Sequence, residues 1–104
     1  MKRFVLYSDL KPDKVEDYKK IHLEAWPEIC EIIKKANICN YSISVRGTSV
    51  YTFYEYTGDD YDADMAKMEE YPIMQEWWSH TKPCFLHHEE GWYYEDLDEV
   101  FWLE

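Results

Sequence analysis

Glycine is scarce in this chain of 104 residues, which contains three glycines, Gly47, Gly58 and Gly91. They stand far apart, so the sequence has no glycine-rich loop to cradle phosphate groups, and we expect no nucleotide cofactor. No serine occupies the Gly-x-Ser-x-Gly setting of an α/β-hydrolase nucleophile. These absences leave chemistry that needs neither a nucleotide nor an activated serine.

Cysteine is equally sparse, with three residues and no Cys-x-x-Cys pair. An odd number of separated cysteines does not form a disulfide framework, and a reducing compartment fits best. The apolar run before Asp9 is too short for a signal peptide, so we expect a cytoplasmic protein. No cysteine lies near a histidine at zinc-ligand spacing, and the adjacent His87 and His88 point in different directions. We therefore expect no metal.

Basic residues are outnumbered two to one: 11 Lys and Arg against 22 Asp and Glu leave a formal charge of −11. So acidic a surface repels phosphate backbones and anionic lipids, which argues against nucleic-acid and membrane partners. The chain also lacks the run of about 20 apolar residues that a membrane span requires. The charge favours a neutral or cationic substrate over a strongly anionic one.

Aromatic residues, in contrast, are abundant at 18% of the chain, with five Trp and ten Tyr. This exceeds what a core of this size needs, so some rings are expected to line a cavity or a subunit interface. A sugar pocket is one interpretation, because an indole face packs well against the C–H face of a pyranose.

The pattern of elements predicts a single domain over residues 1–104. Strand and helix signals indicate, in order, a strand 2–8, a helix from 12 through 22, a break before Pro27, a helix 28–35, a hairpin of strands 40–45 and 49–56, helices 61–70 and 72–81, an irregular segment 82–94 and a strand 97–103. This order is the α+β, ferredoxin-like split βαβ arrangement. Helices cover one sheet face, so the other needs a partner, and we expect a two-fold homodimer, the dimeric α/β barrel.

Tyr18, His22 and Trp26 recur every four residues, which on a helix places them on one face. They combine a hydrogen-bonding phenol, an imidazole that titrates near neutral pH and a flat apolar wall, a set suited to binding a small polyol and moving its protons. The same spacing is also typical of the core face of an amphipathic helix. Both interpretations stay open.

Trp77 and Trp78 are neighbours on a predicted helix, so their side chains point about 100° apart. One ring can enter the core while the other lines a pocket, or both can pack in the core. Tyr41 begins a strand, and its phenol either enters a site from the sheet or packs.

Together these residues carry a resemblance. Tyr18-x-x-x-His22-x-x-x-Trp26-Pro27-Glu28, then Asn40-Tyr41, Trp77-Trp78 and the ending Glu99-Val100-Phe101-Trp102-Leu103 resemble the L-rhamnose mutarotase family over nearly the whole chain. The resemblance implies a dimeric α/β barrel and a cofactor-independent isomerase acting at the anomeric carbon of an aldose. It implies that His22 is the proton donor and that Tyr18, Tyr41, Trp77 and Trp78 contact the sugar. The segment 79–91 and Trp102 depart from the family pattern.

The hypothesis is therefore that His22 acts as an acid toward the ring oxygen of a 6-deoxyhexose, with L-rhamnose as the expected sugar, while Tyr18 and Tyr41 orient the sugar. Trp77 or Trp78 would supply a stacking wall, and Trp26 would brace the helix. Two alternatives compete: a cofactor-free monooxygenase built on the same barrel, since fold alone does not separate the two, and a module that binds a small ligand without turnover.

Overall fold

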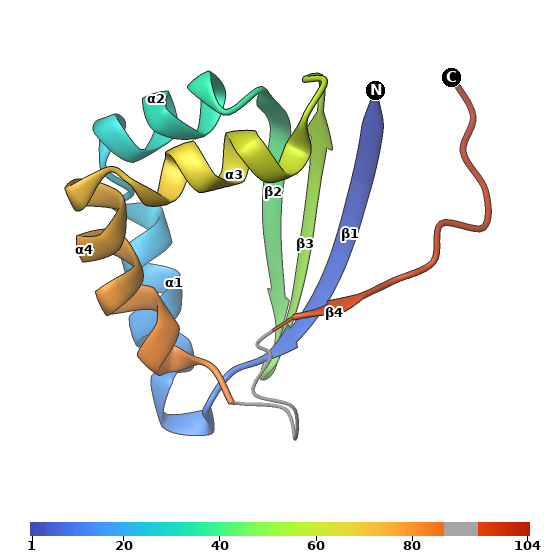
Figure 1. The fold of residues 1–104 in the computed structure, drawn as a ribbon. Coiled ribbons are helices and arrows are strands. Elements are labelled where there is room, and N and C mark those ends of the chain that lie inside the picture. The colour runs from blue at the N-terminus through green and yellow to red at the C-terminus, as the bar shows by residue number, and fades with distance from the viewer. Residues whose placement is uncertain (87–93) are drawn as a thin grey trace.

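The computed structural model describes residues 1–86 and 94–104 of the chain. Its elements, shown in Figure 1, are β1 (Lys2–Asp9), a 3-10 turn (Pro12–Lys14), α1 (Val15–Leu23), α2 (Pro27–Lys35), β2 (Ile38–Arg46), β3 (Ser49–Tyr56), α3 (Tyr61–Glu69), α4 (Pro72–Thr81), a second 3-10 turn (Lys82–Cys84) and β4 (Glu95–Asp96).

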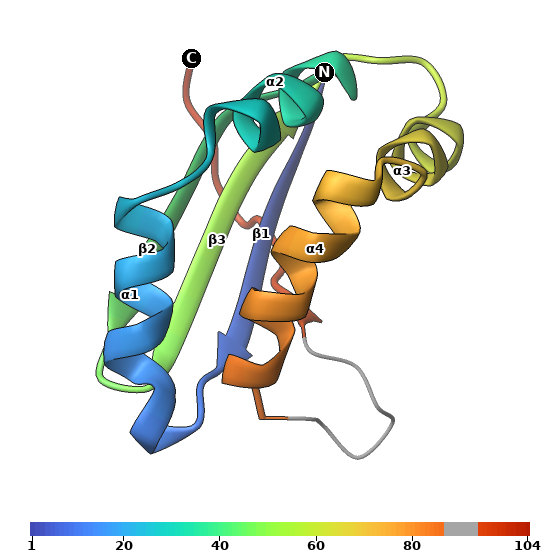
Figure 2. The same ribbon diagram turned by 90° about the vertical axis from the view of Figure 1, so that its left-hand side faces the viewer.

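The four strands form one antiparallel sheet in the order β2-β3-β1-β4. All four α-helices lie on the same face of this sheet, as Figures 1 and 2 show from two directions. The opposite face, which we call the open face, carries no helix. This arrangement confirms the predicted ferredoxin-like α+β fold.

Proline marks where helices begin. Pro12, Pro27 and Pro72 each occupy the first turn of a helical segment, where the missing N–H costs no hydrogen bond. The break predicted before Pro27 is present, because α1 ends at Leu23. Trp26 therefore lies outside α1, and the three-residue stripe predicted on one helix is wrong at this residue. Within the described residues, no helix has the length and apolar character needed to cross a membrane.

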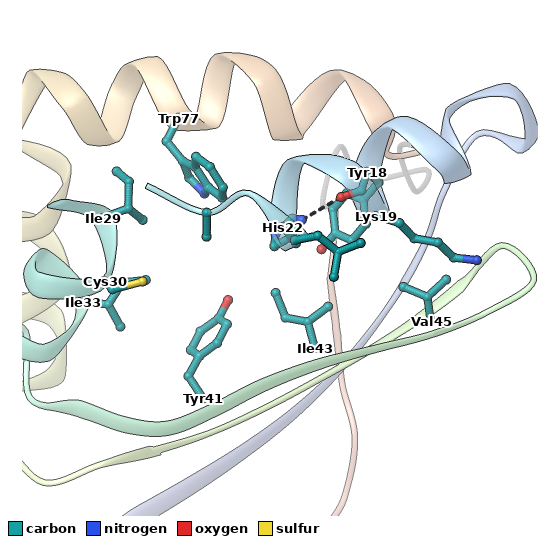
Figure 3. A pocket seen from close by; sticks show the side chains of 12 residues that line it. Tyr18, Lys19, His22, Ile29, Cys30, Ile33, Tyr41, Ile43, Val45 and Trp77 are labelled. Carbon is teal, nitrogen blue, oxygen red and sulfur yellow. Dashed lines mark hydrogen bonds between the residues drawn. The ribbon is translucent and has the colours of Figure 1, made fainter. Parts of the chain in front are cut away.

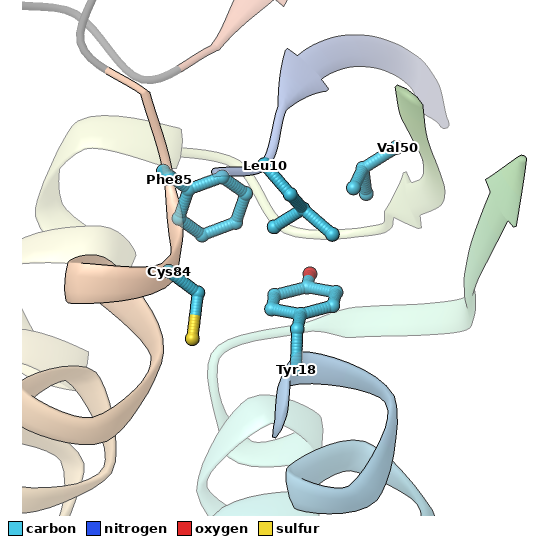
Figure 4. Packing of buried hydrophobic residues seen from close by; sticks show 5 residues of the cluster. All are labelled: Leu10, Tyr18, Val50, Cys84 and Phe85. Atoms are coloured by element: carbon cyan, nitrogen blue, oxygen red, sulfur yellow. The ribbon is translucent and has the colours of Figure 1, made fainter. Parts of the chain in front are cut away.

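Alternation along β1 and β3 separates the two faces of the sheet. Leu10 and Val50 are fully buried beneath the helices, where they form a cluster with Tyr18, Cys84 and Phe85 (Figure 4). Successive residues of a strand point to opposite faces of the sheet. Tyr7 and Tyr51, which directly neighbour the buried Ser8 and Val50, are more exposed and belong to the open face, with ring centroids 5.5 Å apart. The helix face thus carries the core, and the open face carries aromatic rings over which residues 1–86 and 94–104 place no helix or second sheet.

A β-bulge in β2 decides where Tyr41 points. Cys39 pairs with Glu55 and Ser42 pairs with Phe53, so β2 has one more residue than β3 in this interval. Asn40 absorbs the extra residue with a φ of 50°, and its side-chain amide donates to Glu55 at 2.7 Å. Beyond the bulge Tyr41 stacks on Tyr54, with ring centroids 5.5 Å apart, on the helix face. Without the bulge, Tyr41 would pair with Phe53 on the open face.

The prediction of a strand over residues 97–103 is wrong. Strand pairing ends at Asp96, apart from one hydrogen bond from the Leu97 N–H to the Val5 carbonyl, and the chain then runs away from the sheet (Figure 1). Alternating apolar residues favour a strand, but a strand needs a partner edge. The tail is held instead by Arg3. Its guanidinium donates two hydrogen bonds to the Glu99 carboxylate, and the guanidinium carbon lies 3.9 Å from the Trp102 ring centroid.

Candidate active site

A cavity of about 600 Å³ lies between the helices and the edge strand β2 (Figure 3). Four of the five residues predicted to form a site line it together: Tyr18, His22, Tyr41 and Trp77. Aliphatic side chains complete the walls, among them Ile29 from α2 and Ile43 from β2. The volume lies in the range of small-molecule pockets and suits a monosaccharide.

His22 is oriented by its own helix. Its Nδ1 lies 2.9 Å from the backbone carbonyl oxygen of Tyr18, one turn earlier (Figure 3). A carbonyl only accepts, so Nδ1 carries the hydrogen and the lone pair of the neutral ring is on Nε2. Residues 1–86 and 94–104 offer no hydrogen-bond partner to Nε2. Burial lowers the pKa of His22 below 6.5, with the carbonyl contact opposing this, so the neutral ring dominates at pH 7.

Two aromatic rings flank this imidazole. The Tyr18 ring lies 4.2 Å from it, centroid to centroid, and Trp77 meets it edge-on at 5.5 Å. His22 itself is half-buried. The imidazole is therefore neither sealed in the core nor turned out to bulk solvent, and it shares a cavity with two phenols and an indole.

The phenols of Tyr18 and Tyr41 have no hydrogen-bond partner among the described residues, unlike the hydroxyls of Tyr7 and Tyr56. By contrast, the Tyr54 hydroxyl bonds to Tyr61 at 2.5 Å. Burial, the main cause, raises the pKa of both Tyr18 and Tyr41 above the ordinary value of 10. Both phenols therefore stay neutral at physiological pH and can donate a hydrogen bond into the cavity. Figure 3 shows the Tyr41 phenol reaching from β2 across the cavity toward Trp77.

The neighbouring residues Trp77 and Trp78 have different surroundings. Trp77 is 7% exposed, joins a core cluster and also forms a wall of the cavity. Trp78 does not line this cavity: it is half-buried, and the Lys82 ammonium lies 4.9 Å from its ring centroid. A role for Trp78 in sugar binding stays a prediction. Trp26 packs edge-on against Trp77 at 5.2 Å, as expected of a residue that braces the site from outside.

Residues that could hold a metal ion do not gather in the part of the chain that the structure describes. His87 and His88 lie outside that part, so the expectation of no metal site stays a prediction.

Sequence reasoning did not identify the aliphatic walls of the cavity. Ile29 lies in the predicted helix 28–35 and Ile43 in the predicted strand 40–45, and both line the cavity. Their periodicity was a sound signal of which way they face, but it does not distinguish the wall of a cavity from a filled core.

Comparisons with known proteins identify the family of this chain. The family model described as L-rhamnose mutarotase matches residues 3–103. The L-rhamnose mutarotase of Oceanobacillus iheyensis is 33% identical over 105 residues, with all of both chains covered. The crystal structure of an L-rhamnose mutarotase from Formosa agariphila superposes with a TM-score of 0.78 at 21% identity, also over the whole of both chains.

A solved structure from another class shares the fold. A putative antibiotic biosynthesis monooxygenase from Nitrosomonas europaea superposes with a TM-score of 0.60 at 15% identity, over 91% of this chain and 84% of its own. At that identity the likeness concerns the fold alone and does not bear on the reaction. The family match, by contrast, spans nearly the whole sequence. This chain belongs to the L-rhamnose mutarotase family.

Proposed function

We propose that this protein is an isomerase that interconverts the α and β anomers of a 6-deoxyhexose, with L-rhamnose as the preferred sugar. The observation that carries the proposal is one cavity in which a neutral imidazole, two unpartnered phenols and an indole meet, in a chain of this family. The aliphatic walls from Ile29 and Ile43 suit the methyl group that distinguishes a 6-deoxy sugar.

Mutarotation moves one proton and requires no oxidant. The hydroxyl on C1 loses its proton, a C1=O1 double bond forms, the C1–O5 bond breaks and O5 takes up a proton. The aldehyde then turns about the C1–C2 bond, and O5 attacks its other face as the proton returns. O1 and O5 share one carbon, so a single imidazole nitrogen can reach both.

His22 is the residue suited to carry that proton. Its neutral Nε2 accepts the proton from O1, and the resulting imidazolium donates it to O5, which is the acid role predicted from the sequence. Tyr18 and Tyr41 hold the sugar by hydrogen bonds from neutral phenols, and Trp77 supplies an apolar wall. The second indole, Trp78, is retained as a proposed contact on the family resemblance.

The test is the rate of exchange between anomers, followed by saturation-difference NMR with purified protein. We expect exchange above the spontaneous rate with L-rhamnose, and slower exchange with L-fucose and other aldoses. Binding of the sugar without faster exchange would instead support a binding module. Oxygen uptake with a hydroxyaromatic substrate, and no anomer exchange, would support the monooxygenase alternative.

The pH dependence follows from the shift at His22. Burial lowers its pKa below 6.5, so the neutral ring persists to lower pH than in a free histidine. We expect the catalysed exchange rate to be nearly constant above about pH 7.5, and to fall about tenfold per pH unit well below a midpoint that lies under 6.5. Exchange rates corrected for the buffer background measure this midpoint. A midpoint above 6.5 would contradict the assignment of a buried neutral imidazole.

We also propose that two copies of the chain pair through the open face of the sheet. Its central aromatic rings, those of Tyr7, Tyr51 and Phe53, are covered by no helix or second sheet of the part of the chain that the structure describes. Charged groups there are satisfied locally: Arg3 pairs with Glu99, and Asp9 accepts from Tyr7 at 2.5 Å. Such a face suits a second copy better than a charged ligand.

The C-terminal tail supports the same pairing. Val100, Phe101 and Leu103 are 94, 79 and 80% exposed, which is costly for an apolar segment in a monomer. Arg3 ties the tail to the open face through Glu99, and Figure 1 shows the tail on the side of the sheet without helices, where a partner chain would meet it. The alternating apolar residues that predicted a strand over residues 97–103 would then be buried against the partner chain.

Replacing an exposed ring at the centre of the open face tests this pairing. Tyr51 is 44% exposed in the single chain, so Tyr51→Glu leaves the monomer fold intact while placing charge in the interface. We expect sedimentation equilibrium to give twice the 12.7 kDa chain mass for the natural sequence and the chain mass itself for the variant. Tyr71→Glu, on the helix side, is the control. A monomeric natural protein would contradict the pairing.

The cysteines support the predicted cytoplasmic location. Cys30, Cys39 and Cys84 are all free thiols, with Cys84 buried. Free thiols persist in a reducing compartment, and we propose that the protein acts there.

A further inference from the structure

A third tyrosine lies close to the two phenols of the cavity. Tyr94 directly precedes β4, whose residues Glu95 and Asp96 pair with Tyr7 and Leu6 of β1. Continuing this register by one residue brings Tyr94 opposite Ser8, whose fully buried side chain faces the helices. Tyr94 thus approaches the helix face of the sheet from the edge opposite β2.

Ring contacts tie Tyr94 to the site. Its ring lies 5.4 Å from that of Phe85, and Phe85 meets the Tyr18 ring edge-on at 5.2 Å. Tyr18 in turn lies 4.2 Å from the His22 ring. Phe85 is 2% exposed, so it is a fixed platform against which Tyr94 is held. Successive ring contacts thus link Tyr94, just before β4, to the His22 imidazole.

The Tyr94 phenol has the same character as those of Tyr18 and Tyr41. Burial raises the pKa of Tyr94 to about 12, so the hydroxyl is neutral. After burial, Tyr94 is the next cause that raises the pKa of both other phenols. This agrees with the ring contacts through Phe85, which bring Tyr94 near Tyr18. No described residue accepts from or donates to the Tyr94 hydroxyl, whereas Tyr56 donates to Asp64 at 2.5 Å.

Three neutral hydroxyls with no hydrogen-bond partner among residues 1–86 and 94–104, on tyrosines linked through Phe85 and His22 or sharing the cavity lining, can together form a hydrogen-bonding surface for a polyol. We propose that Tyr94 is a third sugar-binding phenol, which donates a hydrogen bond to a pyranose hydroxyl on the side of the site reached from β4. This inference rests on the proposed function and adds to it a residue that selects the sugar. It binds the substrate and takes no part in the proton transfer.

Tyr94→Phe tests the proposal, because it removes the hydroxyl and keeps the ring against Phe85. Loss of one neutral hydrogen bond predicts a KM for L-rhamnose that rises about 2- to 10-fold, with kcat changed less than twofold. Sugar affinity from tryptophan fluorescence titration falls by the same factor. Tyr71→Phe is the matched control: Tyr71 is similarly exposed, at 39% against 43% for Tyr94, but it lies before α4, away from Phe85, and both values should stay unchanged.

Each other outcome decides against a sugar contact. An unchanged KM and affinity in Tyr94→Phe would overturn the proposal while leaving the mutarotase assignment intact. A lowered melting temperature with a parallel fall in kcat would mean that the hydroxyl is structural. If the natural protein neither binds nor turns over any aldose, the proposed function fails, and the role of Tyr94 fails with it.

Discussion

Replacing His22 with alanine is expected to reduce the catalysed anomer exchange by about 10²- to 10⁴-fold, the range that a positioned proton-transfer group contributes. The loss falls on kcat, because the sugar is still held by the phenols of Tyr18 and Tyr41 and by the Trp77 wall. KM should change by no more than a few fold. Saturation-difference NMR at several L-rhamnose concentrations separates the two parameters.

His80→Ala is the matched control for this experiment. His80 is exposed on α4 and meets Trp26 edge-on at 5.9 Å, outside the cavity. The His80→Ala substitution also removes an imidazole, but one outside the cavity, so anomer exchange should stay within about twofold of the natural rate. If His22→Ala also retains near-natural exchange, His22 is not the proton carrier and the mechanism fails.

His22→Asn makes the test sharper. Asparagine keeps a polar group at this position but cannot exchange a proton near neutral pH. We expect it to be as inactive as the alanine variant, and to lose the acid limb of the pH profile that the imidazole produces. Recovery of activity in His22→Asn would mean that position 22 needs only a hydrogen bond.

Local patterns predicted much of the fold because they are physical constraints on short segments. Pro27 and Pro72 mark helix starts since proline lacks an N–H, and Gly47 forms the predicted hairpin with a φ of 60°. The Tyr18–His22 spacing was correct because both residues lie in α1. These features depend on neighbours within one turn of the chain.

Features that depend on distant partners were not predictable in the same way. Residues 97–103 have the pattern of a strand, but the pattern does not reveal whether a partner edge lies beside them. The side of the sheet that Tyr41 faces depends on a bulge of one residue, which alternation alone does not report. Tyr94 is one of ten tyrosines, and the contact with Phe85, which also meets Tyr18, is what places it near the site.

The largest expected effect on stability comes from Trp77→Ala. Trp77 is 7% exposed and packs in one cluster with Ile29, Ile32 and Met74, besides its edge contact with Trp26. Removing a buried indole typically lowers the free energy of unfolding by about 3–5 kcal/mol, from lost transfer energy and from the cavity left behind. Small domains have about 5–15 kcal/mol in total, so this variant is expected to be marginally folded. Urea denaturation measures the loss.

Trp77→Phe separates packing from function at this position. Phenylalanine keeps an aromatic ring against Trp26 and beside His22, so we expect a loss of about 1–2 kcal/mol, in the usual range for a point mutation. Because the domain stays folded, anomer exchange can be measured, and a higher KM with little change in kcat is expected of a wall residue that takes no proton. A stable Trp77→Ala protein with natural exchange would show that this indole neither supports the fold nor forms the sugar pocket. Trp77 packs in the core and also forms a wall of the cavity. We therefore expect Trp77→Ala to lose more stability than Trp77→Phe, and Trp77→Phe to lose sugar affinity while staying folded.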